Sequence, residues 1–576
     1  MAVEALPGAG AALLQALKRA PSRRAGRPMD WPRPAILKGV PGLEAARQQE
    51  ARGYVADKHF APVPLALPLD WGLNPFKDKA WIMRFMCLQP ADAYFYAYDE
   101  TGEAHWLQKA CALMLDWAQF HIAESKKAYL SWIDMACGYR AIKIALLIDH
   151  WLEGRLAIAP DRMALLLDAA LAHVDELCNP ETLSHGNHGI FQMHGLSILA
   201  GMLGELGPAP AARAYAATTM DMLVRKQFDA QGSHLEHSPQ YHYWMCDELK
   251  SLLDSGWHEV DHFDAVHARA MKLRPWLTYP DGRLVPVGDT ITQFRHPSAP
   301  DPADATFAGE RFMARCLDAG YAIVRSLPAD DPKGTMLFLQ AAYHSKAHKH
   351  SDHLHLEFFD RGQPVLVDSG STGYRGDARR AYCLSTRAHN TVEFDGLSHA
   401  RDGSHAYGSA LKRLTVFERG LRVQAEVAHG AHGVVHRRTV DIEPGRRLRV
   451  RDEVQAARPR DFIQWFHFAP ALELVTLAEH DGHAVLLDGK PTWWIRALDP
   501  VEEVLLVRGQ EAPVLQGWCA AGMDRLSPSW AVGYRQHGSA VGFRFELVRA
   551  GPRWPAPGLG REPVAVFEPP WAGGQG

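Results

Sequence analysis

The sequence has little cysteine, almost no net charge and no long apolar run. The eight cysteines are scattered over 576 residues without a Cys-x-x-Cys pair, so we expect buried thiols and no disulfide framework. The 62 Lys and Arg nearly balance the 66 Asp and Glu, and the formal charge of −4 offers no general attraction to nucleic acid or to an anionic membrane. Any polyanion must therefore be bound by a local basic cleft.

Segments that would direct the chain to or through a membrane are also missing. The stretch 184–204 lacks Asp, Glu, Lys and Arg but contains three His and five Gly, which makes it too polar to span a bilayer. The apolar stretch 5–17 is followed rather than preceded by basic residues, the reverse of a signal peptide. We expect no membrane span, no signal peptide and a cytoplasmic location, with the periplasm left open if the start site is misassigned.

The hydrophobic pattern predicts a helical part followed by a β part. Apolar residues recur every three to four positions in the segments 105–122, 132–153, 162–177, 188–203, 211–228 and 243–256, as in paired antiparallel helices. Beyond the proline-rich stretch 296–304 the period becomes two, which is typical of antiparallel strands. We predict an α+β multidomain fold: an arm with short helices at 1–80, an α/α toroid at 81–295, a linker at 296–306 and an antiparallel β-sandwich at 307–576.

The 30 histidines are concentrated in 185–262 and 344–405, which suggests sites. The first group, Ser184-His-Gly-Asn187-His188-Gly189, directly precedes a predicted helix. Amide, imidazole and backbone donors at a helix N-terminus could bind a carboxylate. An ordinary helix cap with histidines facing solvent explains the pattern equally well.

The second group is 232–243, a predicted loop with one Glu, three His and two Tyr before an apolar helix. A tyrosine beside cationic or hydrogen-bonding neighbours can have its pKa lowered from about 10, and can then act as a base. Without further context, the more ordinary interpretation is that Tyr241 and Tyr243 are aromatic residues that pack at an interface.

The third and densest group runs from His344 to His355 and continues with Asp368 and His389. If the His-x-His pair lies on a strand, both rings point to one face, and an Asp from the adjoining strand with a further His completes a zinc site. Histidines on strands usually pack across strands. However, Asp368 ends an apolar segment, where a buried charge needs a partner or a metal.

These segments carry a resemblance to a known family. His348-Lys-His350-Ser-Asp-His-Leu, Pro364-Val-Leu-Val-Asp368-Ser-Gly370 and Ser385-Thr-Arg-Ala-His389-Asn-Thr391 are similar to the signature of the heparinase II/III-like polysaccharide lyases. Asn187-His188 and Glu236-x-Ser-Pro-x-Tyr241-His242 resemble motifs of that family's helical domain. The likeness covers most of the chain, and its five motifs occur in the family's order.

The resemblance implies an incomplete (α/α) toroid followed by an antiparallel β-sandwich, and cleavage of uronate-containing polysaccharides by β-elimination. By position, Asn187 would neutralise the substrate carboxylate with help from His188. Tyr241 would be the base and acid. His348 would be a second proton-transfer residue, and the candidate base for the opposite C5 epimer.

The resemblance also implies one structural zinc per chain, bound by His350, Asp368 and His389. An anionic polysaccharide is the expected partner, and nucleic acid is not. Side chains expected to bind this substrate are Glu236, His242, Tyr374 and Arg387. Whether the chain forms a homo-oligomer, and whether it cleaves at chain ends or internally, is left open.

Two other functions stay open at this stage. A zinc-dependent glycan hydrolase would use a metal-bound water as nucleophile, and a non-catalytic glycan-binding protein would serve exopolysaccharide assembly. Only elimination leaves a conjugated, unsaturated uronate. The substrate stays open among heparan-type glycans, alginate and bacterial exopolysaccharide, because Gly186 stands where some members of the family have a second asparagine.

Overall fold

The computed structural model describes residues 9–17, 27, 29, 34–258, 262–291, 299–477, 482–550 and 563–567. The chain divides into two compact units, one formed by residues 1–227 and 247–264 and the other by residues 228–246 and 265–576. Part of the predicted linker at 296–306 and the Gly/Pro-rich tail from Pro569 lie outside the described residues. The domain ranges inferred from the sequence stay a proposal.

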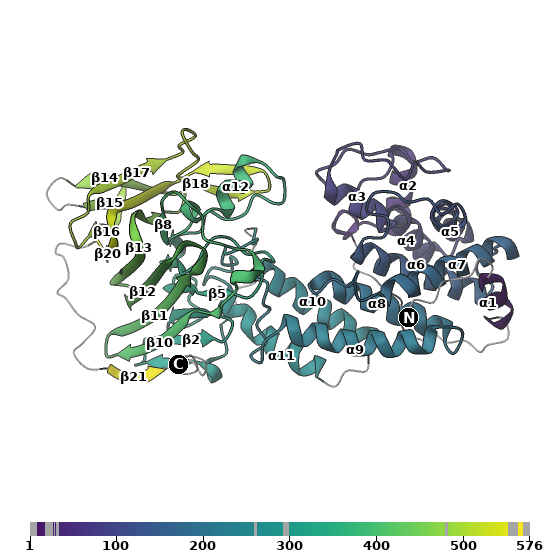
Figure 1. Cartoon of the computed structure of the whole chain (residues 1–576), viewed down its shortest axis with the longest axis horizontal. Helices are drawn as coiled ribbons and strands as arrows, with labels where there is room; N and C mark the ends of the chain where they lie inside the picture. Colours follow the sequence, from purple (N-terminus) through teal and green to yellow (C-terminus); the bar gives the residue numbers. More distant parts are fainter. Residues whose placement is uncertain are drawn as a thin grey trace. The chain divides into compact units, whose positions relative to one another are not determined.

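The first unit is helical (Figure 1). Its helices are α1 (Ala9–Leu17), α2 (Gly42–Arg52), α3 (Lys79–Met86), α4 (Asp92–Thr101), α5 (Ala104–Ala118), α6 (Asp134–Leu152), α7 (Pro160–Leu177), α8 (Asn187–Leu203) and α9 (Ala209–Gln227). The helix α10 (Pro239–Ser255) begins in the second unit and ends in the first. The six helices predicted from periodicity correspond to α5–α10.

The helices α6 and α8 approach closely because two glycines face each other. A Cβ on Gly138 would lie 2.2 Å from the carbonyl oxygen of Phe191, and one on Gly195 would lie 2.3 Å from the carbonyl oxygen of Gly138. Real side chains cannot be placed at such distances, so only glycine allows this spacing. Nearly every residue of α8 is buried, which fixes the segment that carries Asn187.

Among the described residues, no helix is both long enough and apolar enough to cross a membrane.

The second unit contains two large antiparallel sheets (Figure 1). The six-stranded sheet has the order β1-β2-β3-β4-β6-β7, with β1 (Thr306–Ala308), β2 (Phe312–Leu317), β3 (Tyr321–Ser326), β4 (Met336–Gln340), β6 (His355–Asp360) and β7 (Gln363–Leu366). The path of the eleven-stranded sheet is β14-β15-β16-β20-β13-β12-β11-β10-β21, with β17 on β20 and β8 on β13.

The strands of the larger sheet are β8 (Val392–Phe394), β10 (Leu411–Phe417), β11 (Gly420–His429), β12 (Val434–Glu443), β13 (Arg447–His467), β14 (Leu472–Leu477), β15 (Gly482–Leu487), β16 (Lys490–Ala497), β17 (Glu503–Arg508), β20 (Trp530–Arg549) and β21 (Pro563–Phe567). Two small sheets pair β5 (Ala342–Tyr343) with β9 (Gly408–Ser409) and β18 (Trp518–Gly522) with β19 (Arg525–Pro528). The short helix α12 (Ala378–Leu384) lies between β7 and β8 in the sequence.

Successive residues of the six-stranded sheet face two different cores. Ala314, Val324 and Leu337 pack with the larger sheet, whereas their neighbours Met313 and Ile323 pack with the segment that follows α11 (Phe263–Leu273). This alternation is what a pleated strand requires when both faces are covered. The predicted fold class, a helical toroid followed by an antiparallel β-sandwich, is confirmed.

Candidate active site

Tyr241 and His348 form the centre of a polar cluster in the second unit. Tyr241 lies in the first turn of α10, and its ring stacks on the imidazole of His348 with centroids 3.5 Å apart and planes inclined by 21°. The Tyr241 hydroxyl is 2.6 Å from that of Tyr374, which in turn is 3.2 Å from Nδ1 of His348. Two phenols and an imidazole therefore share one hydrogen-bond network.

His348 lies between two carboxylates. Its Nδ1–H donates to Oδ2 of Asp289 at 3.1 Å, and its Nε2 is 3.4 Å from Oε2 of Glu236. Burial lowers the pKa of His348, but the hydrogen bonds to Asp289 and Glu236 outweigh it and raise the pKa above its ordinary value. The two carboxylates therefore favour the protonated form of the imidazole that stacks on the Tyr241 ring.

Burial has the opposite effect on the phenol. It raises the pKa of Tyr241 to about 12, although the hydrogen bond with Tyr374 lowers it. The side chain is therefore a protonated phenol in the resting protein, and any base role depends on neighbours that stabilise the phenolate.

Asp289 connects the cluster to an arginine and to a second histidine. Arg380, on α12, forms an ion pair with Oδ1 of Asp289, and Nε2–H of His350 donates to the same oxygen at 3.0 Å. Burial raises the pKa of this carboxyl, yet the hydrogen bonds from His348, His350 and Arg380 hold the pKa far below its usual range. The guanidinium also lies over the ring of Tyr374, 5.3 Å from its centroid.

The loop that presents His348 depends on a glycine. Gly288 has φ +59°, and a Cβ there would lie 2.6 Å from the carbonyl oxygen of His237 and 2.7 Å from that of His348. The backbone N–H of the next residue, Asp289, donates to the carbonyl of His348 at 3.2 Å. Only glycine lets the two backbones come close enough for this contact.

His237 holds the same loop from another side. Its Nδ1–H donates to the carbonyl of Ala347 at 3.0 Å, and its Nε2 accepts from the N–H of His344 at 2.8 Å. Burial lowers the pKa of His237 to about 3, so the ring stays neutral and can both donate and accept. It is a structural clamp.

The strand predicted for His348 and His350 is wrong. The segment 344–354 is a loop, in which His348 has φ +52°, and β6 begins only at His355. The buried backbone contacts of this loop go to Asp289 and His237, so a strand ladder does not form. Both rings nevertheless donate hydrogen bonds to the same carboxylate, that of Asp289.

The predicted metal ligands do come together. His350, Asp368 and His389 are each fully buried, and one ligand atom from each lies within 4.8 Å of the others. Nδ1 of His350 and Nε2 of His389 are 3.4 Å apart, and Nε2 of His389 is 3.4 Å from Oδ2 of Asp368. Ligands about 2.0–2.1 Å from a tetrahedral zinc are separated by about 3.3–3.4 Å, so the spacing fits.

The hydrogen bonds of these side chains leave lone pairs facing each other. Nε2–H of His350 donates to Asp289, and Nδ1–H of His389 donates to the carbonyl of Ser385 at 2.7 Å. The opposite ring nitrogens therefore carry no proton in the neutral rings. Oδ2 of Asp368 has no hydrogen-bond partner within the described residues. Burial and nearby carboxylates, Glu357 first, raise the pKa of Asp368, and a bound cation would relieve both the repulsion and the burial.

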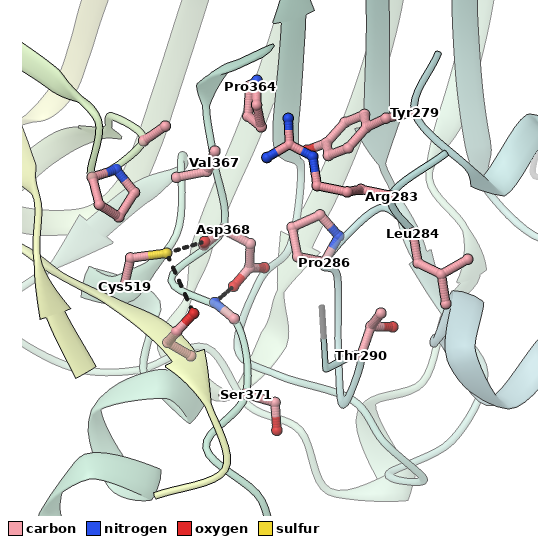
Figure 2. Close-up of a pocket in the computed structure, with 15 residues that line it drawn as sticks. Tyr279, Arg283, Leu284, Pro286, Thr290, Pro364, Val367, Asp368, Ser371 and Cys519 are labelled. Carbon is pink, nitrogen blue, oxygen red and sulfur yellow. Dashed lines mark hydrogen bonds between the residues drawn. The ribbon is translucent and has the colours of Figure 1, made fainter. Parts of the chain in front are cut away.

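A cavity of about 160 Å³ lies beside Asp368 and Ser371 (Figure 2). Its other walls are largely apolar, and Cys519 fixes one side by donating from Sγ to the carbonyl of Asp368 at 3.7 Å. Tyr241 and His348 are not among the residues that line it. The cavity is therefore separate from the Tyr241–His348 pair.

Asn187 and His188 belong to the helical unit. Asn187 is the first residue of α8 and is buried, and Nδ1–H of His188 donates to Oδ1 of Asp134 at 3.1 Å. Gln192 fixes the preceding loop by accepting from the N–H of Ser184 at 2.9 Å. The motif is thus ordered by its own helix and by α6.

Two residues expected to bind substrate have other contacts. His242 donates from Nε2 to the carbonyl of Ala270 at 2.9 Å and accepts at Nδ1 from the N–H of His234. Arg387 donates to Oε1 of Glu393 through Nε and Nη2. Their roles in substrate binding stay predictions.

Sequence reasoning missed Asp289 and gave Arg380 no defined role. Asp289 lies in a short Val-Gly-Asp-Thr segment without a recognisable motif. The glycine at position 288 is the only local signal of a close backbone approach.

Comparisons with known proteins agree with this architecture. The family model "Heparinase II/III N-terminus" matches residues 42–268, and "Heparinase II/III-like, C-terminal" matches residues 309–537. The heparin-sulfate lyase of Pedobacter heparinus is 22% identical over 385 residues, which cover 60% of this chain and 57% of that protein. The chain thus spans a little over half the length of this curated relative.

Solved structures share the fold. Heparinase III superposes with a TM-score of 0.69 at 16% identity, over 94% of this chain and 89% of that one. A chondroitin AC lyase variant from Streptomyces coelicolor A3 gives a TM-score of 0.52 at 14% identity, over 94% of this chain and 83% of that one. With both family domains matched in order on this helical and β-sandwich fold, the chain belongs to the heparinase II/III-like family.

Proposed function

We propose that the protein is a polysaccharide lyase that cleaves a uronate-containing polysaccharide by β-elimination. The observation that carries the proposal is the Tyr241 phenol stacked on an imidazole that lies between the carboxylates of Asp289 and Glu236. Such a pair serves proton transfer, whereas glycan binding alone does not require it. Relatives named as heparin-sulfate lyase and heparinase make glycosaminoglycans the first substrates to test.

Elimination makes three demands on the protein. The proton at C5 is only weakly acidic, so the adjacent carboxylate must be neutralised while a base removes the proton and an acid protonates the leaving oxygen at C4. Asn187 and His188 are our candidates for neutralisation, because an amide and an imidazole can donate to the carboxylate as its charge grows towards an enolate.

Tyr241 is our candidate for both proton transfers. The hydrogen bond with Tyr374 and the charge of Arg380 lower the pKa of Tyr241 and so favour the phenolate, which can take the C5 proton and then return it to the oxygen at C4 on the same face. For the opposite C5 epimer the proton leaves from the other face, and His348 is the candidate second proton-transfer residue.

We propose that His350, Asp368 and His389 bind one structural zinc. Two neutral imidazoles and a carboxylate are ligands that zinc prefers. The positive charge of a zinc ion bound there would link the loop that contains His348 to Asp368 at the end of its strand. The three side chains are fully buried. This burial speaks against the hydrolase alternative, since a metal-bound water that attacks a polymer needs an open position.

The test is a panel of uronate polysaccharides: heparin, heparan sulfate, chondroitin sulfate, alginate and acidic exopolysaccharides. New ultraviolet absorbance from a conjugated uronate is expected with at least one of them, and none is expected with the Tyr241→Phe protein. Cleavage without such absorbance would overturn the proposed reaction.

A further inference from the structure

A second group of histidines lies apart from the ligands around Asp368. His353 precedes β6, His399 follows β8, and His429 is the last residue of β11. One ring nitrogen from each lies within 4.8 Å of the others. The ring centroids are 4.4 Å apart for His399 and His429, and 5.0 and 5.3 Å from His353 to these two.

All three side chains are more than nine-tenths buried, with exposed fractions of 3%, 2% and 5%. Within the described part of the chain, neither ring nitrogen of His353 has a hydrogen-bond partner, and Nε2 of His429 has none. His399 donates from Nε2 to the carbonyl of Val392 at 2.9 Å, which leaves its unpartnered Nδ1 with a lone pair. The group thus directs unsatisfied nitrogens at one another.

Simple packing does not account for this arrangement. Buried polar atoms in folded proteins nearly always have partners, because leaving one unsatisfied is costly. The neighbouring His436 donates from Nε2 to Asp452 at 2.8 Å, and only its Nδ1 has no partner among the described residues. Burial lowers the pKa of His353, His399 and His429 well below the ordinary value, so the rings are neutral and protonation does not supply the missing partner.

Neutral imidazole is the ligand form that zinc and related transition metals bind. We propose that His353, His399 and His429 form a second zinc site, separate from the one at His350, Asp368 and His389. Tyr407 is the candidate for a fourth ligand. Tyr407 contacts the His353 ring with centroids 5.3 Å apart, and its hydroxyl is buried without a partner among the described residues.

The site would stabilise the loop that presents His348. His353 ends the loop 344–354, and the other two ligands come from the larger sheet and the segment beside it. A metal here therefore links that loop to the sandwich at a point different from Asp289 and Asp368. This inference uses none of the residues assigned to proton transfer, and it holds whether or not the protein is a lyase.

Elemental analysis of the purified full-length protein tests the proposal, after chelator treatment and reloading with zinc followed by desalting. We expect two equivalents of zinc for the unmodified chain, and one each for His399→Gln, His429→Gln and His389→Gln. His436→Gln, which changes a neighbouring buried histidine outside the site, should retain two. A zinc content that is the same in His399→Gln and His429→Gln as in the unmodified chain would overturn the proposal.

Cobalt titration of the stripped, unmodified chain covers the case in which the variants do not fold. Two spectroscopically distinct cobalt ions are expected to bind, one in an all-nitrogen or nitrogen–phenolate environment and one with a carboxylate ligand. Saturation at a single equivalent, with the spectrum of a carboxylate-ligated ion, would contradict the second site. It would leave the first site intact.

Discussion

The imidazole of His348 stacks on the phenol of Tyr241 with ring centroids 3.5 Å apart, and the hydroxyl of Tyr374 lies within hydrogen-bond distance of both side chains. The hydrogen bonds to Asp289 and Glu236 raise the pKa of His348, whereas burial raises the pKa of Tyr241 to about 12 although the hydrogen bond with Tyr374 lowers it.

Tyr241→Phe should lower kcat by about 10²–10⁴-fold, the range typical of losing a general base, without a change in melting temperature large enough to indicate unfolding. The ring remains in its stack and only the hydroxyl is lost. Tyr243→Phe is the matched control on the same helix, because the Tyr243 hydroxyl bonds to Arg274 and Thr278 instead. Equal turnover by the two variants would remove Tyr241 from the mechanism.

Asp289→Asn should lower kcat by about 10–100-fold, as changes to residues that orient functional groups usually do, with little effect on KM. The neutral amide still accepts a hydrogen bond but no longer favours the cationic imidazole. Asp221→Asn, in an ion pair with Arg225 on α9, serves as a control for losing a carboxylate. If Asp289→Asn keeps the parental kcat, the charge of His348 is irrelevant to turnover.

Asn187→Ala should impair the chemical step more than substrate binding. The hydrogen bond from the amide strengthens as the substrate carboxylate gains enolate character, so it contributes mainly in the transition state. Steady-state kinetics should show a lower kcat with a nearly unchanged KM. A raised KM at constant kcat would mean that Asn187 only binds substrate.

Gly288→Ala should destabilise the protein and abolish turnover, whereas Gly309→Ala should be tolerated. Both glycines have φ +59°, but a Cβ on Gly309 meets nothing within 4 Å. The control therefore separates two effects on stability. One is the cost of placing alanine in the left-handed region, about 1–2 kcal/mol, and the other is the clash of the new Cβ with the carbonyls of His237 and His348. The measurements are denaturant unfolding and activity of both variants. Equal losses of stability in the two variants would refute a special role for Gly288.

Removing metal with a chelator should lower the melting temperature and reduce activity, because the His350 ring and Asp368 would lose the ion that links them. His389→Ala should reproduce the effect at that site. Differential scanning calorimetry with and without added zinc is the measurement. Unchanged melting of the stripped protein would argue against a structural metal.

Much of the fold could be predicted because its hydrophobic periods are regular. The helices α6–α9 and the strand β12, whose buried and partly exposed residues alternate, follow their patterns closely. The strands β2 and β3 carry no such alternation, because nearly all of their residues are buried, as in strands that are covered on both faces.

The candidate site was predictable only where side-chain chemistry forms a motif. Tyr241, His348 and the metal ligands stand in His-rich or Tyr-rich segments, whereas Asp289 is one carboxylate among 66 acidic residues. Its importance comes from the approach of the Gly288 backbone to His348, a tertiary contact without a local signature. The same contact explains why the expected His348–His350 strand is a loop.

The central claim is that cleavage proceeds by elimination, and solvent labelling during turnover tests it most directly. Once a substrate is identified, the reaction is run in water enriched in heavy oxygen and the products are analysed by mass spectrometry. The account predicts an unsaturated uronate at the new non-reducing end and no heavy oxygen at the cleaved bond, because the C4–O bond breaks without addition of water. A saturated product carrying one heavy oxygen per cleavage would contradict it.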